Sequence, residues 1–376
     1  EAGFALAVGT ECSIDAEGSE GDDESQYGGD NDNDSSGILE YVVVKHTGAQ
    51  VANGDELNGI SFGGVGRGTV IKNLQVYSTY DDGIEFFGGS ADVDGFVALY
   101  VRDDSIDLDE GYNGTISNAI VIQQADDGDH CIEADGIGSY SGYPDTPEGE
   151  AAKQALIAAG LNSRPTINNL TCIISPNLGG THGEGAGWRF REGIWPVVNN
   201  ALLISSFAAN DTTDGDDNYC LRIDNPETAD AAVNGDLQLN SVVFACQENA
   251  KGNAVGGFAS EQAWAEDAGN QFATVADGTA KDASAANDAD LQLLEAAAEA
   301  GKAVVVADRP VPLPRATNGT PWRWQRASTS ETWRVVSGST TSGAWISSPL
   351  ALSQKATSAA SPTVPLPLKS MICPLP

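Results

Sequence analysis

Basic residues, histidine and methionine are scarce in this sequence. Of its 376 residues, 19 are Lys or Arg, 3 are His and 1 is Met, whereas 54 are Asp or Glu, so the formal net charge is −35. This charge excludes a nucleic-acid-binding protein, because nothing would offset the repulsion from phosphate groups. Long apolar runs are missing too, and none approaches the ~20 residues of a membrane span, so we expect no transmembrane segment.

Glycine and apolar side chains are abundant instead. Glycine occurs 43 times, and hydrophobic residues make up 41 % of the chain, which is enough for a sizeable core. This composition is typical of a turn-rich, all-β, extracellular protein. The sequence begins at Glu1 without an initiator Met or a signal peptide, so we expect it to be a processed product or a fragment.

Acidic pairs recur at a nearly constant interval in the first half of the chain. The steps between them are 22 and 23 residues. The pairs are Asp81-Asp82, Asp103-Asp104 and Asp126-Asp127. Each is followed by a short segment with apolar residues at alternate positions, and these segments are 84–86, 106–108 and, after a small insertion, 132–134. A repeat of this kind indicates a stack of similar coils.

A second feature keeps the same register. Eight residues before the acidic pairs lie Asn73, Gly95 and Asn118, and looser copies follow at Asn169, Asn200 and Asn240. Asn and Gly tolerate the left-handed backbone of a tight corner, and stacked Asn side chains can hydrogen-bond along the axis. The pattern predicts an all-β fold, a right-handed parallel β-helix with coils of about 22–26 residues. A β-sandwich, the alternative, would not explain why acids, Asn and apolar residues keep one register.

Several segments carry a resemblance to a known family. They are ELNGISFGGVGRGT (56–69), DDGIEFFGG (81–89), DDSIDLDEGYNGTI (103–116), IEADG (132–136) and REG (191–193). Through them, residues 37–247 resemble secreted bacterial proteins of the pectate-lyase-like β-helix class, and more narrowly a poorly characterised, lipoprotein-like group from aquatic bacteria. The resemblance implies the fold and export, and it implies no reaction because no activity is established for this group.

The coils are expected to occupy residues 37–250. Residues 1–36 are an acidic N-terminal segment, for which truncated first coils are one interpretation. Residues 137–163 interrupt the repeat with helical spacing, and we expect a helical insertion that leaves the solenoid at one corner.

The C-terminal third of the chain differs from the coils. Residues 251–308 are Ala-rich and predict a helical cap on the last coil, with a helix at 287–301. Residues 309–376 hold 7 Lys or Arg and one acid, Glu331, and are rich in Pro and Ser. We interpret this basic tail as an aberrant or disordered end, with a linker or a strap over the acidic body as alternatives.

The six cysteines show no zinc-type spacing. Cys220 and Cys246 lie 26 residues apart in strand-like segments, so we expect a disulfide between them. Cys131 and Cys172 are a second candidate pair that would span the insertion, and buried free thiols are the alternative. Cys12 and Cys373 have no assigned partner. Disulfides would fit an exported protein, at an extracellular or outer-surface location.

Stacked coils would bring the repeated carboxylates into a column. Strands lie ~4.8 Å apart, and two unit charges at ~5 Å repel by about 3 kcal/mol at an effective dielectric of about 20. Calcium would remove this repulsion, since it binds carboxylate and carbonyl oxygens, whereas a solvated acidic face is the alternative. The predicted ligands are Asp81, Asp82, Asp103, Asp104, Asp107, Asp126 and Asp127, with Asp30, Asp32, Asp34, Glu85 and Asp109 as secondary candidates.

Arginine and tryptophan residues indicate a possible sugar-acid groove near residues 188–195. Alternation places Arg189 and Arg191 on one strand face, and a polysaccharide lyase needs a Lys or Arg base with a lowered pKa. The catalytic candidates are Arg189, Arg191 and Lys45, and Trp188 and Trp195 are candidates for stacking on sugars. The alternative is that the Arg side chains only pair with the acidic columns.

These patterns favour a structural function over catalysis, because acids repeated on several coils do not form one singular site. We expect a secreted or cell-surface, calcium-stabilised β-helix that serves as a structural, adhesive or glycan-contacting module. A polysaccharide lyase or glycoside hydrolase acting on an anionic polysaccharide is one alternative. A filament or surface-layer subunit is another, since β-helix ends invite axial self-association. His46, His130 and His182 fit turn or core positions better than catalysis.

Overall fold

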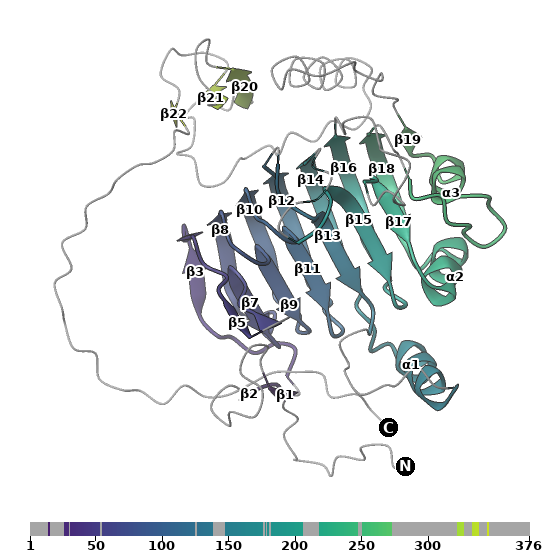
Figure 1. Cartoon of the computed structure of the whole chain (residues 1–376). Coiled ribbons are helices and arrows are strands. Elements are labelled where there is room, and N and C mark those ends of the chain that lie inside the picture. Colours follow the sequence, from purple (N-terminus) through teal and green to yellow (C-terminus); the bar gives the residue numbers. More distant parts are fainter. Residues whose placement is uncertain are drawn as a thin grey trace.

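The structure of the chain is a computed structural model (Figure 1). The residues it describes are 14–15, 26–29, 31–52, 55–124, 126–137, 147–175, 177, 179, 182–205, 218–246, 250–272, 322–326, 333–337 and 344–345. Cys12, Cys373, Asp30 and the helix expected at 287–301 lie outside them. No helix of this described part is long and apolar enough to cross a membrane.

Two long parallel sheets, here named sheet I and sheet II, face each other (Figure 1). Sheet I begins with β3 (Ile38–Glu40) and β4 (Val43–Lys45), which both pair with β8, and it runs through β8 (Val70–Tyr77), β10 (Val93–Leu99), β12 (Thr115–Ile122), β14 (Thr166–Ile174), β16 (Val197–Ser205), β18 (Gln238–Ala245) and β19 (Gln271–Phe272). Sheet II runs through β7 (Ile60–Gly63), β9 (Ile84–Phe87), β11 (Ile106–Asp109), β13 (His130–Asp135), β15 (Ala186–Arg191) and β17 (Leu221–Ile223). Consecutive strands from β7 to β18 alternate between the two sheets, so the chain winds as a parallel β-helix, the right-handed form predicted.

The remaining elements are short. Antiparallel pairs form between β1 (Ile14–Asp15) and β2 (Gln26–Tyr27), and between β5 (Gln50–Ala52) and β6 (Asp55–Glu56). The strands β20 (Trp322–Arg326), β21 (Trp333–Ser337) and β22 (Ala344–Trp345) form a separate antiparallel sheet. Helix α1 (Pro147–Ala159) falls within the expected insertion, and α2 (Pro226–Asn234) and α3 (Glu261–Asp267) lie beside the last coils (Figure 1).

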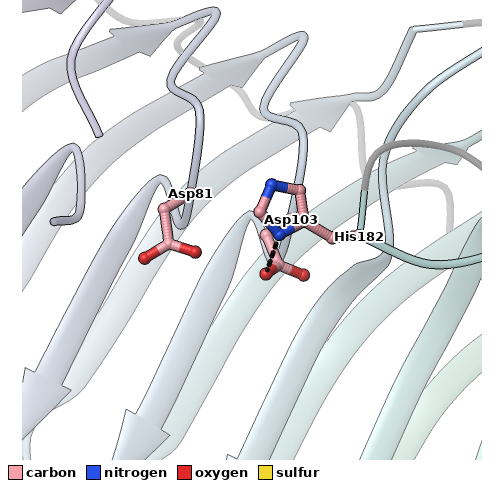
Figure 2. A group of neighbouring side chains, drawn as sticks. All are labelled: Asp81, Asp103 and His182. Carbon is pink, nitrogen blue, oxygen red and sulfur yellow. Dashed lines mark ion pairs between the residues drawn. The ribbon is translucent and has the colours of Figure 1, made fainter. Parts of the chain in front are cut away.

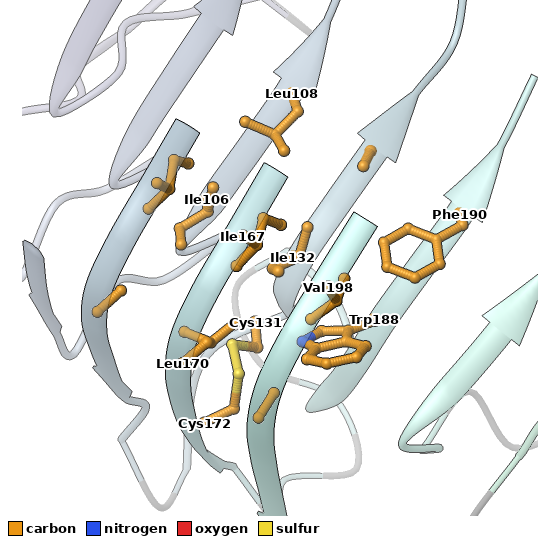
Figure 3. Close-up of a cluster of buried hydrophobic side chains, with 14 of the residues drawn as sticks. Ile106, Leu108, Cys131, Ile132, Ile167, Leu170, Cys172, Trp188, Phe190 and Val198 are labelled. Atoms are coloured by element: carbon orange, nitrogen blue, oxygen red, sulfur yellow. A yellow bond between two sulfur atoms is a disulfide. The ribbon is translucent and has the colours of Figure 1, made fainter. Parts of the chain in front are cut away.

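The core lies between the two sheets because alternate residues of each strand point inward. In sheet II these are pairs such as Ile106 and Leu108, and Trp188 and Phe190, all at most 1 % exposed. Figure 3 shows them facing Ile167 and other apolar side chains of sheet I. The outward positions between them are free to carry charge, which is where the site is built.

Left-handed residues bend the strands of sheet I. Asn73, Asn118, Asn169 and Asn200 have φ between 57° and 64°, and Gly95 has φ 89°, as predicted for the corner position. The Asn side chains also hydrogen-bond along the axis: Asn200 donates to Asn169 and Asn169 donates to Asn118. In the last copy the left-handed residue is Ser241 (φ 60°), because Asn240 is aligned with Asn199. The prediction was therefore one residue early there.

Both expected disulfides are present. Cys131 and Cys172 are bonded with their Cα atoms 6.2 Å apart, and Cys220 and Cys246 with theirs 6.0 Å apart. Figure 3 shows the first bridge inside the apolar core. Cys131–Cys172 joins β13 of sheet II to β14 of sheet I, and Cys220–Cys246 joins the residue before β17 to the residue after β18. Closing loops of this size contributes about 3–4 kcal/mol in the chain-entropy model.

Candidate metal-binding site

An acidic pocket opens on the outer side of sheet II. Its volume is about 320 Å³, and eight of its ten lining side chains are carboxylates. They are Asp81, Asp82, Glu85, Asp103, Asp104, Asp107, Asp129 and Glu133, with His130 and Arg189. Nearly all the side-chain charge around this pocket is therefore negative.

A row of outward residues in register on successive coils, here named the outer row, passes through the pocket. Its members are Ser61, Glu85, Asp107, Glu133, Arg189 and Arg222. Each lies between two inward apolar residues of its strand, so the same alternation that builds the core places these side chains outside. Three neighbouring members are acids, and the next two are Arg.

A second row precedes the strands of sheet II. The Asp82 carboxylate accepts a hydrogen bond from the Asp104 backbone N–H at 3.0 Å, and the Asp104 carboxylate accepts one from the His130 backbone N–H at 2.7 Å. Asp82, Asp104 and His130 therefore occupy equivalent places on three coils. Likewise Asp129, which precedes His130, takes the place that Asp81 and Asp103 have on the earlier coils.

The predicted third rung of the column, Asp126 and Asp127, is wrong. Asp126 is exposed, and Asp127 lies 3.7 Å from the Arg102 side chain; neither lines the pocket. The register is set by the strand that pairs with Ile106 and its neighbours, and three additional residues separate the acidic pair from that strand. Asp129 enters the pocket in their place.

Of the secondary metal candidates, one lines the pocket and others lie elsewhere. Glu85 lines the pocket and accepts a hydrogen bond from the Asn58 side chain, whereas Asp109 is buried but does not line it. Asp32 and Asp34 belong to another turn, in which their backbone carbonyls accept hydrogen bonds from Arg67 and Gly68. The structure does not join this turn to the pocket.

Burial and mutual repulsion raise the pKa values of the pocket carboxyls. For Asp82, Asp104 and Asp107, burial raises the pKa well above its usual value, and neighbouring carboxylates raise it further. Burial also raises the pKa of Asp129 to about 6, against the lowering effect of His130. At neutral pH these carboxyls need protons or cations to offset their charge.

The carboxylates are close enough to share a cation. In two groups, Asp82–Glu85–Asp107 and Asp82–Asp103–Asp104, one ligand oxygen from each residue lies within 4.8 Å of the others. These groups offer oxygen atoms only, which is the donor set that calcium prefers. Two further groups include an imidazole: Asp104–His130–Glu133, and the set Asp81, Asp103 and His182 shown in Figure 2.

Two histidines belong to this region, and sequence reasoning missed both. His130 bonds through Nδ1 to Asp104 and through Nε2 to the Tyr219 hydroxyl, each at 2.8 Å. His182 Nδ1 lies 2.9 Å from Asp103 Oδ2. The position of His130 could be deduced only once the register of the third coil was known, and no pattern in the sequence placed His182 beside Asp103.

The two Arg side chains of β15 share one face, as predicted, and are engaged by acids. Arg189 contacts Glu133 at 2.9 Å and Asp224 at 3.1 Å, and Arg191 contacts Glu133 at 2.8 Å and also Asp135. Burial alone would lower the pKa of Arg191, but Asp135 and Glu133 outweigh it and raise the pKa. A lyase base needs the opposite shift. Lys45 lies apart on sheet I.

The sugar-stacking prediction for Trp188 is wrong. Its side chain is 0 % exposed and packs in the core, because the alternation that turns Arg189 outward turns Trp188 inward. Trp195 is partly buried, and the Arg164 guanidinium lies 3.9 Å from its ring centroid. Trp195 does not line the acidic pocket.

These features define a class of protein: a disulfide-containing parallel β-helix with an acidic pocket on the outer side of one sheet. A family model described as a pectate-lyase-like beta helix domain matches residues 7–291. The chain belongs to this family. Comparison with curated proteins and with solved structures finds no significant match.

Proposed function

We propose that the acidic pocket binds calcium and that the bound ion stabilises the β-helix. The observation that carries this proposal is the set of eight carboxylates around one pocket with a single Arg among its lining residues. Asp82 belongs to both oxygen-only groups, which makes it the central ligand of the proposed site.

The energetic reason is repulsion between partly buried charges. At ~5 Å and an effective dielectric of about 20, each carboxylate pair costs about 3 kcal/mol, against a total domain stability of roughly 5–15 kcal/mol. An ion held by either oxygen-only group, Asp82–Glu85–Asp107 or Asp82–Asp103–Asp104, would connect the coils of β9 and β11. It would thereby stabilise the folded state over the unfolded chain, which lacks the assembled site.

The experiment measures the metal content and thermal unfolding of the full chain, with calcium and after exhaustive chelation. At a calcium concentration of about 100 Kd the expected stabilisation is ~2.7 kcal/mol. The variant Asp82→Asn keeps the size of the side chain and an oxygen that can accept from the Asp104 N–H, but it removes the charge. It should lose most of the calcium effect.

The matched control is Asp126→Asn, which removes an exposed acid outside the pocket. This variant should keep the full calcium effect. An unchanged melting temperature of the wild-type chain after chelation would refute the proposal.

We further propose that this calcium-stabilised domain acts outside the cell or on its surface, as a structural, adhesive or glycan-contacting module. The two disulfides support an oxidising compartment, and the membership of the pectate-lyase-like family supports a solenoid that presents a long outer face. Fractionation of the producing cells with an antibody against the chain tests the location. Recovery of reduced protein from the cytoplasm alone would contradict it.

A second candidate is an enzyme or binding module for an anionic polysaccharide, favoured by one observation: Arg189 lines the acidic pocket. A bound cation and this guanidinium could together hold the carboxylate of a sugar acid. Screening uronate polysaccharides for unsaturated products by ultraviolet absorption tests a lyase, and binding measurements test a non-catalytic module. Activity or binding that persists in Arg189→Ala would exclude this residue from the role.

A further inference from the structure

A mixed group of donors lies at the edge of the acidic pocket. Asp81, Asp103 and His182 each offer one ligand atom, and these atoms lie within 4.8 Å of one another. Figure 2 shows the two carboxylates side by side on neighbouring coils, with the imidazole above Asp103. Asp81 precedes β9 and Asp103 precedes β11, so the stacking of the coils aligns them.

The imidazole comes from a distant part of the chain. His182 follows Asp103 by 79 residues and lies just before β15. Its ring meets the Tyr80 ring edge to face, with centroids 5.0 Å apart, and its side chain is 14 % exposed. The next residue, Gly183, lies so close to the Asp129 carboxylate that a Cβ there would collide with it. The segment is therefore seated against the pocket, and His182 is held in a defined position.

This donor set differs in kind from the oxygen-only groups of the proposed calcium site. Calcium is a hard cation that takes oxygen ligands, whereas imidazole suits zinc and related first-row ions. Zinc sites with three protein ligands and one open position can combine His with a carboxylate, as His₂Glu sites do. The group also shares Asp103 with the oxygen-only group Asp82–Asp103–Asp104, so an ion here would neighbour the proposed calcium.

We propose that Asp81, Asp103 and His182 form a second metal site, selective for a divalent ion of the zinc type. This proposal goes beyond the calcium site and does not require it, because Asp103 is the one of its three ligands that also belongs to an oxygen-only group, and Asp82, Glu85 and Asp107 are not among its ligands. The simpler reading of the same contacts is that His182 only pairs with Asp103.

The test uses the full chain in saturating calcium, so that the oxygen-only groups are occupied or calcium fails to bind at all. Cobalt(II) serves as an optical probe, because its visible absorption reports low-coordinate nitrogen and oxygen ligation, and zinc is then titrated to displace it. We expect one cobalt per chain with visible bands. His182→Ala should weaken cobalt and zinc binding by at least ~10-fold, the loss found when even an outer-shell partner of a ligand is removed.

The matched control is His46→Ala, which removes an exposed histidine just after β4 and should leave cobalt binding unchanged. If His182→Ala fails to fold, Asp81→Asn replaces it, because that variant keeps the His182–Asp103 pair and removes only a ligand. Absence of visible bands in the wild type would overturn the proposal, and so would cobalt binding by these variants that equals that of the wild type. In either case His182 would only form an ion pair with Asp103.

The outcome is separable from that of the calcium proposal. Asp82→Asn should remove most of the calcium stabilisation while cobalt still binds through Asp81, Asp103 and His182. Cobalt binding without any calcium effect would reject the calcium site alone, and the reverse result would reject the zinc-type site alone.

Discussion

The outer row of sheet II changes sign between two adjacent coils. Glu85, Asp107 and Glu133 occupy it in the earlier coils, and Arg189 and Arg222 occupy it in the later ones. The backbone pairing and the inward apolar residues are alike on both sides of this border. The two regions therefore differ in side-chain charge and share one backbone scaffold. This is expected where a fold carries a local site without a change in its architecture.

The two regions handle their carboxylates in opposite ways. In the later coils burial would raise the pKa of Asp224, but hydrogen bonds from Arg222 and Arg189 outweigh it, and the pKa is lowered. In the earlier coils burial and neighbouring acids act together, and the pKa values of Asp82, Asp104 and Asp107 are raised. The later acids are compensated by the protein itself, and the earlier acids have to be compensated by protons or cations.

The largest expected effect on stability comes from removing Arg189, the first basic residue after the acids of the outer row. Arg189→Ala would leave Glu133 and Asp224 short of one partner each, at side-chain exposures of 15 % and 17 %. We expect a loss of roughly 2–3 kcal/mol in the free energy of unfolding, below the ~3–5 kcal/mol of a fully broken buried pair, because Arg191 and Arg222 remain. Urea denaturation in calcium-free buffer measures it.

The control for this change is Arg102→Ala. Arg102 is 44 % exposed and lies 3.7 Å from Asp127, so its removal should cost less than ~0.5 kcal/mol. Calcium should also recover part of the Arg189→Ala loss, since the variant extends the acidic region by one coil. Equal losses in the two Arg variants would mean that the sign of the outer row is irrelevant to stability.

The next largest effect is a dependence of stability on pH, which arises from the acidic region. The folded-state pKa of Asp129 is raised to about 6, and those of Asp82, Asp104 and Asp107 are raised in the same direction. Above the unfolded-state pKa near 4, the folded protein therefore binds more protons than the unfolded chain. Metal-free protein should lose about 2 kcal/mol as the pH rises from about 4 to about 7.

Urea denaturation of metal-stripped protein across this pH range measures the loss. Calcium should remove it at the upper end of the range, because the ion replaces the protons. A metal-free protein whose stability rises steadily over the same interval would show that salt-bridged acids such as Asp224 dominate, and that the acidic coils are not under strain.

The sequence alone predicted the coils and the stacking of Asp82 on Asp104, because both depend on residues repeated at a fixed interval. The disulfides were predicted on other grounds: Cys220 and Cys246 lie about one coil apart in strand-like segments, and Cys131 and Cys172 flank the insertion. The third coil could not be predicted from the acidic pairs, since inserted residues move Asp126 away while hydrogen bonding keeps the strands aligned. His182 could not be placed because it reaches the pocket from a non-repeating segment. The alternation that turns Arg189 outward also predicts that Trp188 points inward.

A smaller effect, with a change of sign, is expected from Asp107→Asn. In metal-free protein the amide removes one charge from a repelling row, so stability should rise by about 1 kcal/mol. With calcium present the variant lacks one charged ligand. A tenfold loss of calcium affinity would reduce the stabilisation of the folded state by ~1.4 kcal/mol. Paired melting curves with and without calcium measure both values. The same sign under both conditions would argue that Asp107 touches no ion.

The smallest effect is expected at the residue that the repeat placed wrongly. Asp126→Asn changes an exposed side chain outside the pocket, so the free energy of unfolding should stay within ~0.5 kcal/mol with or without calcium. Asp129→Asn, three residues later, should behave as a pocket residue and stabilise the metal-free protein at neutral pH. A calcium response in Asp126→Asn but not in Asp129→Asn would contradict this assignment. The acids of the third coil would then follow the spacing of the acidic pairs in the sequence rather than the register of the strands, and Asp126 would belong to the acidic region in place of Asp129.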